Sequence, residues 1–512
     1  MSAELSAGII PQTAKLSTDV SREPEKDAEV GLGSSPAAGI ASSQTTASNK
    51  EASVAEHVVD WTVEEETRLV RKLDWIILPP LVFAFLALQL DRGNIGSAYT
   101  DGFSFDVGIT QDQYNTGNTL FSVGSVVLQI PSNLILYRIG PTVWVAAQIF
   151  AFGLVSTFQA WQHGRRAFFA TRTLLGLCES GFIPAGLYTL SRWYKKNEIS
   201  KRYAIYFFGN NLATAISGLL ASGILRLDGV HGFFGWQWLF IIEGCFTIAA
   251  GLYFVIIFPK SPENPVSLFR IRWFNERDSH IMTKRVFVDD PAKAQGRLHV
   301  SWHEIKRTIT NWRLFSHIII PLAGIAPSWT LGAYAPYLVM EMGYGKLEAN
   351  ALCSVGGFML VPMNMIWGYI ADKTRRRGLM VTIGLSIYLA FTIANRKLIL
   401  VDDKHLRLPM LILMVAFSAC WYPINASLVA LNATTPEERS VSLATVTMCA
   451  NLAGIIGSNL FRAADGPFFP HGWDSLCAVV GTALAFSLIV NVQYYVLNRR
   501  IKKSEGEELW HI

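Results

Sequence analysis

Long apolar segments separated by short polar stretches fill the chain from Trp75 onward. Twelve such segments occur, each near the roughly 20 residues that an α-helix needs to cross a bilayer. The pattern therefore predicts twelve transmembrane helices. Their approximate limits are 75–98, 114–136, 142–162, 167–190, 203–225, 237–258, 314–339, 348–371, 379–395, 409–432, 440–461 and 474–497.

The polar stretches divide the twelve predicted helices into two groups of six. The longest of them separates the sixth helix from the seventh. The first 60 residues contain no Phe, Trp or Tyr, so they cannot bury enough apolar surface to fold. We therefore expect an all-α membrane protein with a disordered cytosolic tail at 1–65, an N-terminal six-helix bundle at 66–258, a cytosolic central loop at 259–313, a C-terminal six-helix bundle at 314–498 and a cytosolic tail at 499–512.

Basic residues are concentrated in the loops on one side of the predicted membrane. Lys and Arg are frequent in residues 192–202, 372–378 and 498–503. The loop 99–113, on the opposite side, holds three aspartates and no Lys or Arg. Because cytoplasmic loops carry the excess of positive charge, both termini are predicted to face the cytosol. We expect the plasma membrane as the location.

Composition excludes several classes of protein. Of the 512 residues, 51% are hydrophobic and only 16% are charged, whereas soluble domains contain about 25% charged residues. The net charge of +5 gives no case for nucleic-acid binding. The six cysteines lack the paired spacing of a metal site or a disulfide framework. No nucleophile–base pair or glycine-rich phosphate loop occurs, so we expect no catalytic residues, no metal and no cofactor.

Two ionisable residues, Asp91 and Arg92, end the first apolar run. Residues 75–90 carry no charge at all. Each ionised group at membrane depth costs about 2.5–3.5 kcal/mol on insertion scales. Adjacent residues on a helix do not face each other. Each of the two therefore needs a partner from another helix or from a ligand.

The fourth predicted helix carries a second pair, Arg172 and Glu179. Seven residues are about two helical turns, so both side chains project from one face, about 10.5 Å apart along the axis. Arginine binds carboxylates in a bidentate manner, and burial favours the protonated form of a carboxylate. If helices one and four line one cavity, the pattern predicts co-transport of an organic anion with protons. An internal charge pair that fixes bundle packing is the alternative for this pair.

The loop after the eighth predicted helix contains a glycine, an aspartate and basic residues at fixed spacing. Gly368, Asp372, Lys373 and Arg376 match the G-x-x-x-D-[RK]-x-x-[RK] signature of the major facilitator superfamily. A glycine lets neighbouring helices approach, and an aspartate near a helix start meets arginines and the helix dipole. We therefore assign these four residues to a gate. A positively charged anchor with a tight turn is the alternative.

Several longer motifs resemble the fungal anion:cation symporter family of that superfamily, with its allantoate and nicotinate permeases. They are DRGNIGSA (91–98), PSN (131–133), RTLLGLCESGFIPAG (172–186) and GIIGSNLFRAADGPFF (454–469). The resemblance implies the major facilitator fold. It also implies proton coupling through Asp91 and Glu179, and substrate binding through Arg92, Arg172, Asn451, Asn425 and Tyr337, with aromatic packing as the alternative for Tyr337.

The predicted function is proton-coupled import of a small organic anion, such as nicotinate or allantoate, by alternating access. The partners expected are the anion, protons and the lipid bilayer, with the protein acting as a monomer. Efflux of a secondary metabolite from a biosynthetic gene cluster is the alternative. The segment LATAISGLLASG (212–223) lacks the proline of a common efflux motif, which argues against export. A nutrient receptor without transport is a third hypothesis.

Overall fold

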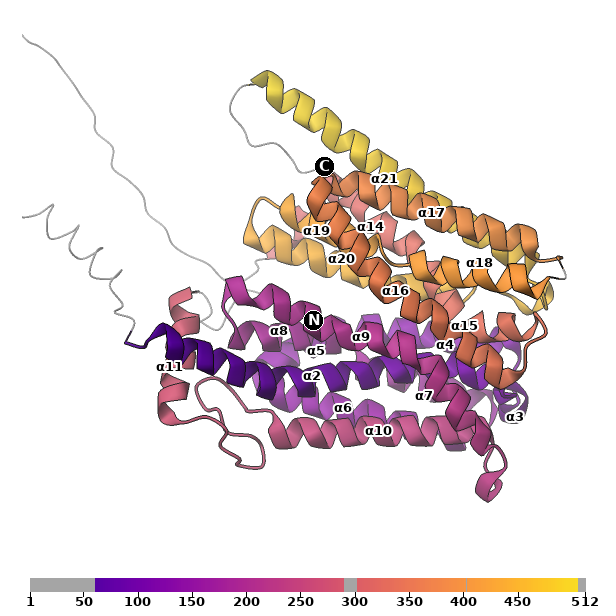
Figure 1. Ribbon diagram of the computed structural model, residues 1–512, viewed down its shortest axis with the longest axis horizontal. Helices are drawn as coiled ribbons and strands as arrows, with labels where there is room; N and C mark the ends of the chain where they lie inside the picture. Colours follow the sequence, from indigo (N-terminus) through magenta and orange to yellow (C-terminus); the bar gives the residue numbers. More distant parts are fainter. Residues whose placement is uncertain (1–59, 290–301, 402, 505–512) are drawn as a thin grey trace, which may run out of the picture. The chain divides into compact units, whose positions relative to one another are not determined.

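The computed structural model describes residues 60–289, 302–401 and 403–504 (Figure 1). Residues from Trp61 onward form one compact unit. Of the predicted tail at 1–65, residues 1–59 lie outside the described residues, as do 290–301 of the predicted central loop, residue 402 and residues 505–512. The prediction of a disordered tail is wrong for its last residues, because a helix capped by Thr62 begins at Val63. Within the described part, the chain is helical apart from turns, loops and two isolated β-bridges near residue 266.

The N-terminal half consists of helices joined mostly by short loops. Polar caps start several of them; for example, the Thr62 hydroxyl accepts a hydrogen bond from the Glu65 N–H. The helices are α2 (Val63–Thr100), α3 (Phe103–Val107), α4 (Gln111–Val127), α5 (Gln129–Ile139), α6 (Pro141–Phe158), α7 (Gly164–Glu179), α8 (Phe182–Trp193), α9 (Lys196–Ile224) and α10 (Gly235–Ile257), with 3-10 turns η1 (Gln159–Trp161), η2 (Leu225–Leu227) and η3 (Val230–Gly232).

The C-terminal half repeats this plan after a central segment whose described residues contain two short helices. Those two are α11 (Glu276–Asp289) and α13 (Trp302–Ile309). The helices that follow are α14 (Trp312–Gly324), α15 (Ala326–Met340), α16 (Lys346–Thr374), α17 (Arg377–Leu398), α18 (Lys404–Phe417), α19 (Tyr422–Leu431), α20 (Pro436–Gly457) and α21 (Pro470–Ser504), with the 3-10 turn η4 (Ala463–Asp465).

The helices of the described residues account for the predicted spans. Ten helical segments are long and apolar enough to cross a bilayer, counting α14 with α15 and α18 with α19 as single segments. The bent pair α4 and α5 makes an eleventh across its 41° bend. The fourth predicted span is divided into α7 and α8. The prediction of an all-α, multi-pass membrane protein is confirmed. Up to eleven of the twelve predicted spans are long and apolar enough to cross a bilayer among the described residues, because neither α7 nor α8 alone is long enough.

Side chains from neighbouring helices hold the break between α7 and α8 in place. Gly181 has a φ of +78°, a conformation that favours glycine, and a Cβ there would lie 2.6 Å from the Ser132 Oγ. Ser180 donates a hydrogen bond from its hydroxyl to the Ser125 carbonyl at 2.6 Å, and the Gln148 side chain donates to the Ser180 carbonyl at 2.7 Å. These contacts fix the position of Glu179, the last residue of α7.

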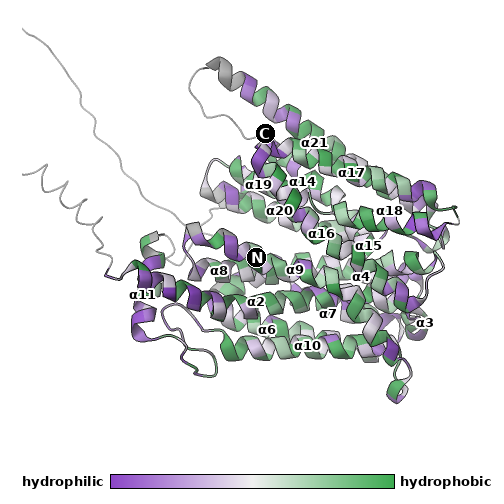
Figure 2. Cartoon of the chain, viewed as in Figure 1, coloured by the Kyte–Doolittle hydropathy of each residue, from purple (hydrophilic) through white to green (hydrophobic). Residues whose placement is uncertain are grey.

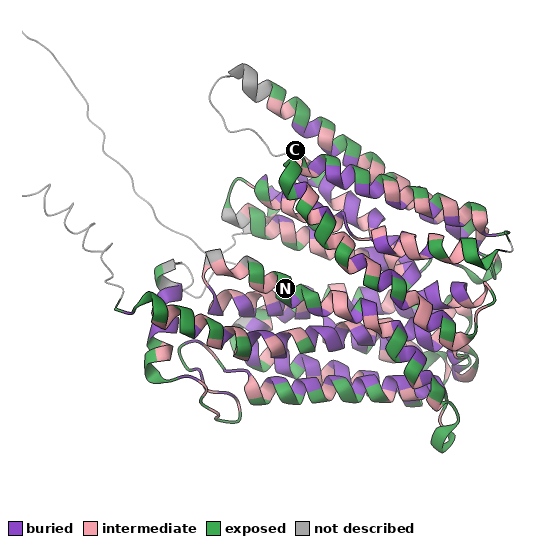
Figure 3. Cartoon of the chain, in the orientation of Figure 1, coloured by how far each residue is buried: buried purple, intermediate pink, exposed green. Residues whose placement is uncertain are grey.

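Large apolar side chains are exposed along the outward faces of the helices, as expected for contact with lipid. Figure 2 shows hydrophilic residues gathered on α11 and at helix ends, with hydrophobic residues along the middle of the helices. In Figure 3, exposed and buried residues alternate along the same helices. Exposed examples are Phe83, Leu154, Leu252, Phe358 and Ile489.

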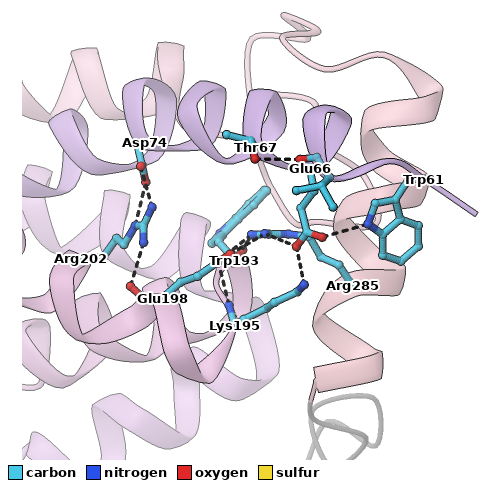
Figure 4. A network of polar contacts seen from close by, with 10 residues as sticks. Trp61, Glu66, Thr67, Asp74, Trp193, Lys195, Glu198, Arg202 and Arg285 are labelled. Carbon is cyan, nitrogen blue, oxygen red and sulfur yellow. Dashed lines mark hydrogen bonds and ion pairs between the residues drawn. The ribbon is translucent and has the colours of Figure 1, made fainter. Parts of the chain in front are cut away.

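A network of polar contacts attaches α11 to the start of α2, the end of α8 and the first turn of α9 (Figure 4). Its centre is the fully buried Arg285 of α11. The Arg285 guanidinium lies 3.3 Å from Glu66 and 3.0 Å from Glu198, and donates a hydrogen bond to the Trp193 carbonyl at 3.1 Å. Lys195 also pairs with Glu66. The central segment is thereby anchored to the N-terminal half.

Replacing Arg285 with methionine should lower the stability of the protein markedly. The change leaves Glu198 without this cation, and breaking a buried ion pair costs about 3 kcal/mol or more. Thermal melting of the purified protein measures the effect. The matched control is Arg277→Met on the same helix, where an exposed guanidinium lies 3.2 Å from Glu65 and the cost should stay below about 1 kcal/mol. Equal melting temperatures for the two variants would contradict this anchoring role.

Candidate substrate cavity

A cavity of about 420 Å³ lies between the two halves. Its volume falls within the roughly 300–1,000 Å³ typical of small-molecule sites. Both halves contribute apolar walls, including Phe121 from α4 and Trp329 from α15. The polar part of the lining consists mainly of Gln89, Arg92, Asn118, Arg172, Asn210 and Ser354.

Arg92 forms an ion pair with Glu179 across the interface of α2 and α7. The Arg92 Nε lies 2.6 Å from the Glu179 Oε2, and the carboxylate side chain is fully buried. The other carboxylate oxygen, Oε1, has no hydrogen-bond partner. Arg92 also lines the cavity, whereas Glu179 lies behind it. The prediction that Arg92 takes its partner from another helix is confirmed.

Arg172 places a buried guanidinium at the cavity wall, and two of its nitrogen atoms have no hydrogen-bond partner. Its Nη2 donates a hydrogen bond to the Asn118 Oδ1 at 2.8 Å. The guanidinium lies 4.9 Å from the centre of the Phe121 ring, and that of Arg92 lies 5.6 Å from the same ring. Such cation–π contacts hold both cations at one wall. The Arg172 Nε and Nη1 are buried and have no hydrogen-bond partner in the protein.

Asp91 lies away from the cavity, against α6. Its side chain is 1% exposed, and its Oδ1 accepts a hydrogen bond from the Ser156 hydroxyl. The Oδ2 has no partner. The four ionisable residues predicted from the sequence are therefore brought into one region of the N-terminal half. The two arginines face the cavity, and the two carboxyl groups lie behind them.

Glu243 of α10 is a third buried acid in this region, and it is absent from the residues predicted from the sequence. Glu243 is 3% exposed, and neither of its carboxyl oxygens has a hydrogen-bond partner. It interacts electrostatically with Asp91 and lies beside Asn94. The sequence did contain a signal, because Glu243 is the one charged residue in the apolar helix Gly235–Ile257.

The other three residues predicted to bind substrate do not lie at the cavity wall. The Asn425 Oδ1 is 2.9 Å from the His317 Nδ1, and His317 also contacts the Tyr494 hydroxyl at 3.1 Å. These bonds hold Asn425 inside the C-terminal half. Tyr337 packs its ring 5.5 Å from that of Tyr99, and Asn451 is likewise outside the lining. For Tyr337, the structure shows aromatic packing.

Hydrogen bonds and ion pairs join the two halves at one end of the cavity, called here the far end. It is the end where α2 finishes at Thr100 and α16 begins at Lys346. Lys346 lies 2.6 Å from Asp101 and 3.2 Å from Asp228, and Asn350 donates to the Thr100 hydroxyl at 2.9 Å.

Burial raises the pKa of the Asp101 carboxyl, and the Lys346 ammonium opposes that shift. As the pH falls, Asp101 is therefore protonated at a higher pH than an ordinary aspartate. Its ion pair with Lys346 is lost at that higher pH.

Close backbone approach and buried polar contacts complete the closure of the far end. A Cβ at Gly96 would lie 2.3 Å from the Gly332 carbonyl oxygen, so only glycine fits between α2 and α15 there. The Tyr334 hydroxyl donates to the Asn115 Oδ1 at 2.5 Å, and the Asn115 side chain donates to the Phe461 carbonyl at 2.6 Å. The halves are thus sealed together above the cavity.

Replacing Lys346 with glutamine should let the far end open more often. Loss of an ion pair worth about 1 kcal/mol shifts the opening equilibrium about fivefold. Cys353 lines the cavity, so it reports access when the other five cysteines are replaced by serine. We expect a membrane-impermeant maleimide added on the far-end side to label Cys353 about fivefold faster.

Arg396→Gln is the matched control for this prediction. Arg396 pairs with Asp474 at 2.7 Å, and both residues belong to the C-terminal half. Its loss should leave the labelling rate of Cys353 unchanged. If Lys346→Gln behaved like this control, the ion pairs at the far end would have no part in closing it.

The sequence pattern described as Major Facilitator Superfamily matches residues 81–458. The chain belongs to the major facilitator superfamily. Over 455 residues it is 27% identical to "MFS-type transporter cnsO" of Penicillium expansum, with 87% of this chain and 86% of that protein covered. Over 435 residues it is 27% identical to "Putative tartrate transporter" of Agrobacterium vitis, covering 82% and 95%. The protein is therefore a membrane transporter and not an enzyme.

A solved structure shares this major facilitator fold. The partially occluded inward-open xylose transporter XylE from E. coli resembles it with a TM-score of 0.62 at 13% identity, covering 80% of this chain and 96% of that chain. The similarity in sequence is low, so it bears on the fold alone.

The superfamily loop signature is present, but its packing differs from our expectation. Asp372 pairs with Arg377, the first residue of α17, at 2.7 Å, and Lys373 and Arg376 are exposed. A Cβ at Gly368 would meet no atom within 4 Å, so this glycine does not serve close helix packing in this conformation. The expected contact between the aspartate and an arginine of the adjacent helix is present, through Arg377.

Proposed function

We propose that this transporter imports a small organic carboxylate together with protons, as a member of the anion:cation symporters. The observation that carries the proposal is Arg172. Its buried guanidinium lies at the wall of a cavity of suitable size, and its Nε and Nη1 have no hydrogen-bond partner in the protein. Guanidinium groups bind carboxylates through charge-assisted hydrogen bonds. The Agrobacterium vitis relative is named for tartrate, which is itself a carboxylate.

The Arg92–Glu179 pair supplies the coupling to protons in this proposal. While Glu179 is ionised, it holds Arg92 at 2.6 Å. A proton that binds to the free Oε1 neutralises the carboxylate and releases Arg92. Arg92 and Arg172, which lie over the same Phe121 ring, then both attract the substrate anion. Proton binding and anion binding therefore favour each other, as symport requires.

The proposed orientation places both termini in the cytosol and the far end outside the plasma membrane. The basic loops described above support this orientation through the distribution of Lys and Arg. Alternating access would then open the far end, where Lys346 and Asp101 meet, to admit substrate from outside. The substrates proposed are nicotinate, allantoate or a similar carboxylate.

Uptake into vesicles that contain the purified protein tests the substrate class. The external solution is made acidic, and each carboxylate is paired with a neutral analogue: nicotinate with nicotinamide, and allantoate with allantoin. We expect at least one carboxylate to accumulate, its neutral analogue to be excluded, and accumulation to collapse with a protonophore. Equal transport of the neutral analogues would contradict the proposal. Accumulation that requires an acidic interior would show export instead.

A further inference from the structure

Glu243 has the surroundings of an acid that carries a proton. It is buried in α10, and both of its carboxyl oxygens lack hydrogen-bond partners. No arginine or lysine among the described residues interacts with it. An ionised carboxylate without a cation is among the costliest groups to bury. By contrast, Glu179 has Arg92 at 2.6 Å.

The groups around Glu243 are arranged to exchange a proton with it. From α2, the Asp91 carboxyl interacts with it, and the Asp91 Oδ2 is buried without a partner. The Asn94 Nδ2, one turn further along α2, is also buried without a partner. From α6, Ser156 already donates to the other oxygen of Asp91. Asp91 is the one ionisable side chain that interacts with Glu243 within the described part of the chain.

We propose that Glu243 is a third proton-binding residue of this transporter and shares one proton with Asp91 behind the cavity wall. Two neighbouring buried carboxyl groups resist ionising together, and Arg92 and Arg172 act on Asp91 rather than on Glu243. A shared proton turns one carboxyl into a donor for the other. The proton adds to a carboxylate oxygen and leaves from it again, so no other bond changes. This inference rests on the proposed proton coupling.

The shared proton balances the charge of the region. Asp91, Glu179 and Glu243 would together exceed Arg92 and Arg172 by one negative charge if all were ionised. One proton on the Asp91–Glu243 pair makes the region neutral. A further proton on Glu179 then gives one net positive charge, which a singly charged carboxylate neutralises. The loaded and the empty carrier are both electrically neutral in this region, which lowers the cost of rearranging it within the membrane.

Infrared spectra of the full-length protein in lipid test the inference without transport. We expect a protonated-carboxyl band at neutral pH that is lost in Glu243→Gln. In Asp91→Asn the band should persist at a shifted frequency, because the carboxyl that shares the proton with Glu243 is replaced by an amide. The control is Glu348→Gln, which removes an exposed carboxylate at the start of α16 and should leave the band unchanged. A band that persists in Glu243→Gln would overturn the inference. Glutamine has the shape of the protonated acid, so the fold should be retained.

A transport measurement separates this inference from the proposed function. Glu243→Gln should reduce proton-driven accumulation about tenfold and leave exchange of labelled for unlabelled substrate within about twofold. Full accumulation in this variant would overturn the part of Glu243 in coupling. If the wild-type protein showed no proton coupling but the band still disappeared in Glu243→Gln, the proposed function would fail and the proton site would stand.

Discussion

Arg172→Ala is expected to lower the affinity for the carboxylate substrate by about 30-fold or more. Truncating one partner of a buried charge pair costs roughly 2 kcal/mol or more. The guanidinium of Arg172 is buried, and its Nε and Nη1 have no partner within the protein. Arg172→Lys should restore binding only in part, because an ammonium is a point charge that cannot offer two parallel donors. Binding of labelled substrate to the purified protein measures both effects.

Arg166→Ala is the matched control, because Arg166 lies on the same helix and is exposed. The affinity of the Arg166→Ala variant for the substrate should stay within about twofold of the wild-type value. Affinity that survived in Arg172→Ala would show that the anion binds elsewhere. Equal affinities in Arg172→Lys and the wild-type protein would show that binding needs only a positive charge and not the planar guanidinium.

Glu179→Gln should abolish accumulation against a gradient and retain exchange of substrate across the membrane. Glutamine resembles the protonated acid, so Arg92 is released permanently and the cavity still binds the anion. Exchange by the wild-type protein should fall as pH rises, because Glu179 then ionises and recaptures Arg92. Exchange by Glu179→Gln should be independent of pH over the same range. Uptake and exchange in vesicles at a series of pH values measure both.

Glu263→Gln is the control for this second prediction. Glu263 is exposed in the central segment, 3.1 Å from Arg192, and the substitution makes the same change of charge. It should accumulate substrate like the wild-type protein. Full accumulation by Glu179→Gln would remove Glu179 from the coupling mechanism.

Hydrophobic patterning predicted much of the fold because a bilayer leaves few choices of structure. Apolar runs of sufficient length must be helical there, so their number and order follow from the sequence. The cost of burying charge in the bilayer also predicted that Asp91 and Arg92 each need a partner. Charged neighbours on one helix cannot pair, and the structure gives each a partner from a different helix, Ser156 and Glu179.

The sequence did not predict which side chains reach the cavity. That depends on the rotation of each helix and on breaks such as the one at Gly181, which tertiary contacts stabilise. Asn425 was assigned to substrate, but its contact with His317 joins residues 108 positions apart. The Lys346–Asp101 pair at the far end, 245 positions apart, was missed for the same reason. Glu243 could have been found, since a lone acid in an apolar helix is costly.

Simultaneous recording of proton entry and substrate entry tests the central claim most directly. Vesicles containing the purified protein carry a pH indicator inside, and labelled carboxylate is added outside with the membrane potential held at zero. The account predicts that the interior acidifies only when the carboxylate enters, and that Glu179→Gln separates the two fluxes. Substrate entry without acidification in the wild-type protein would contradict the account.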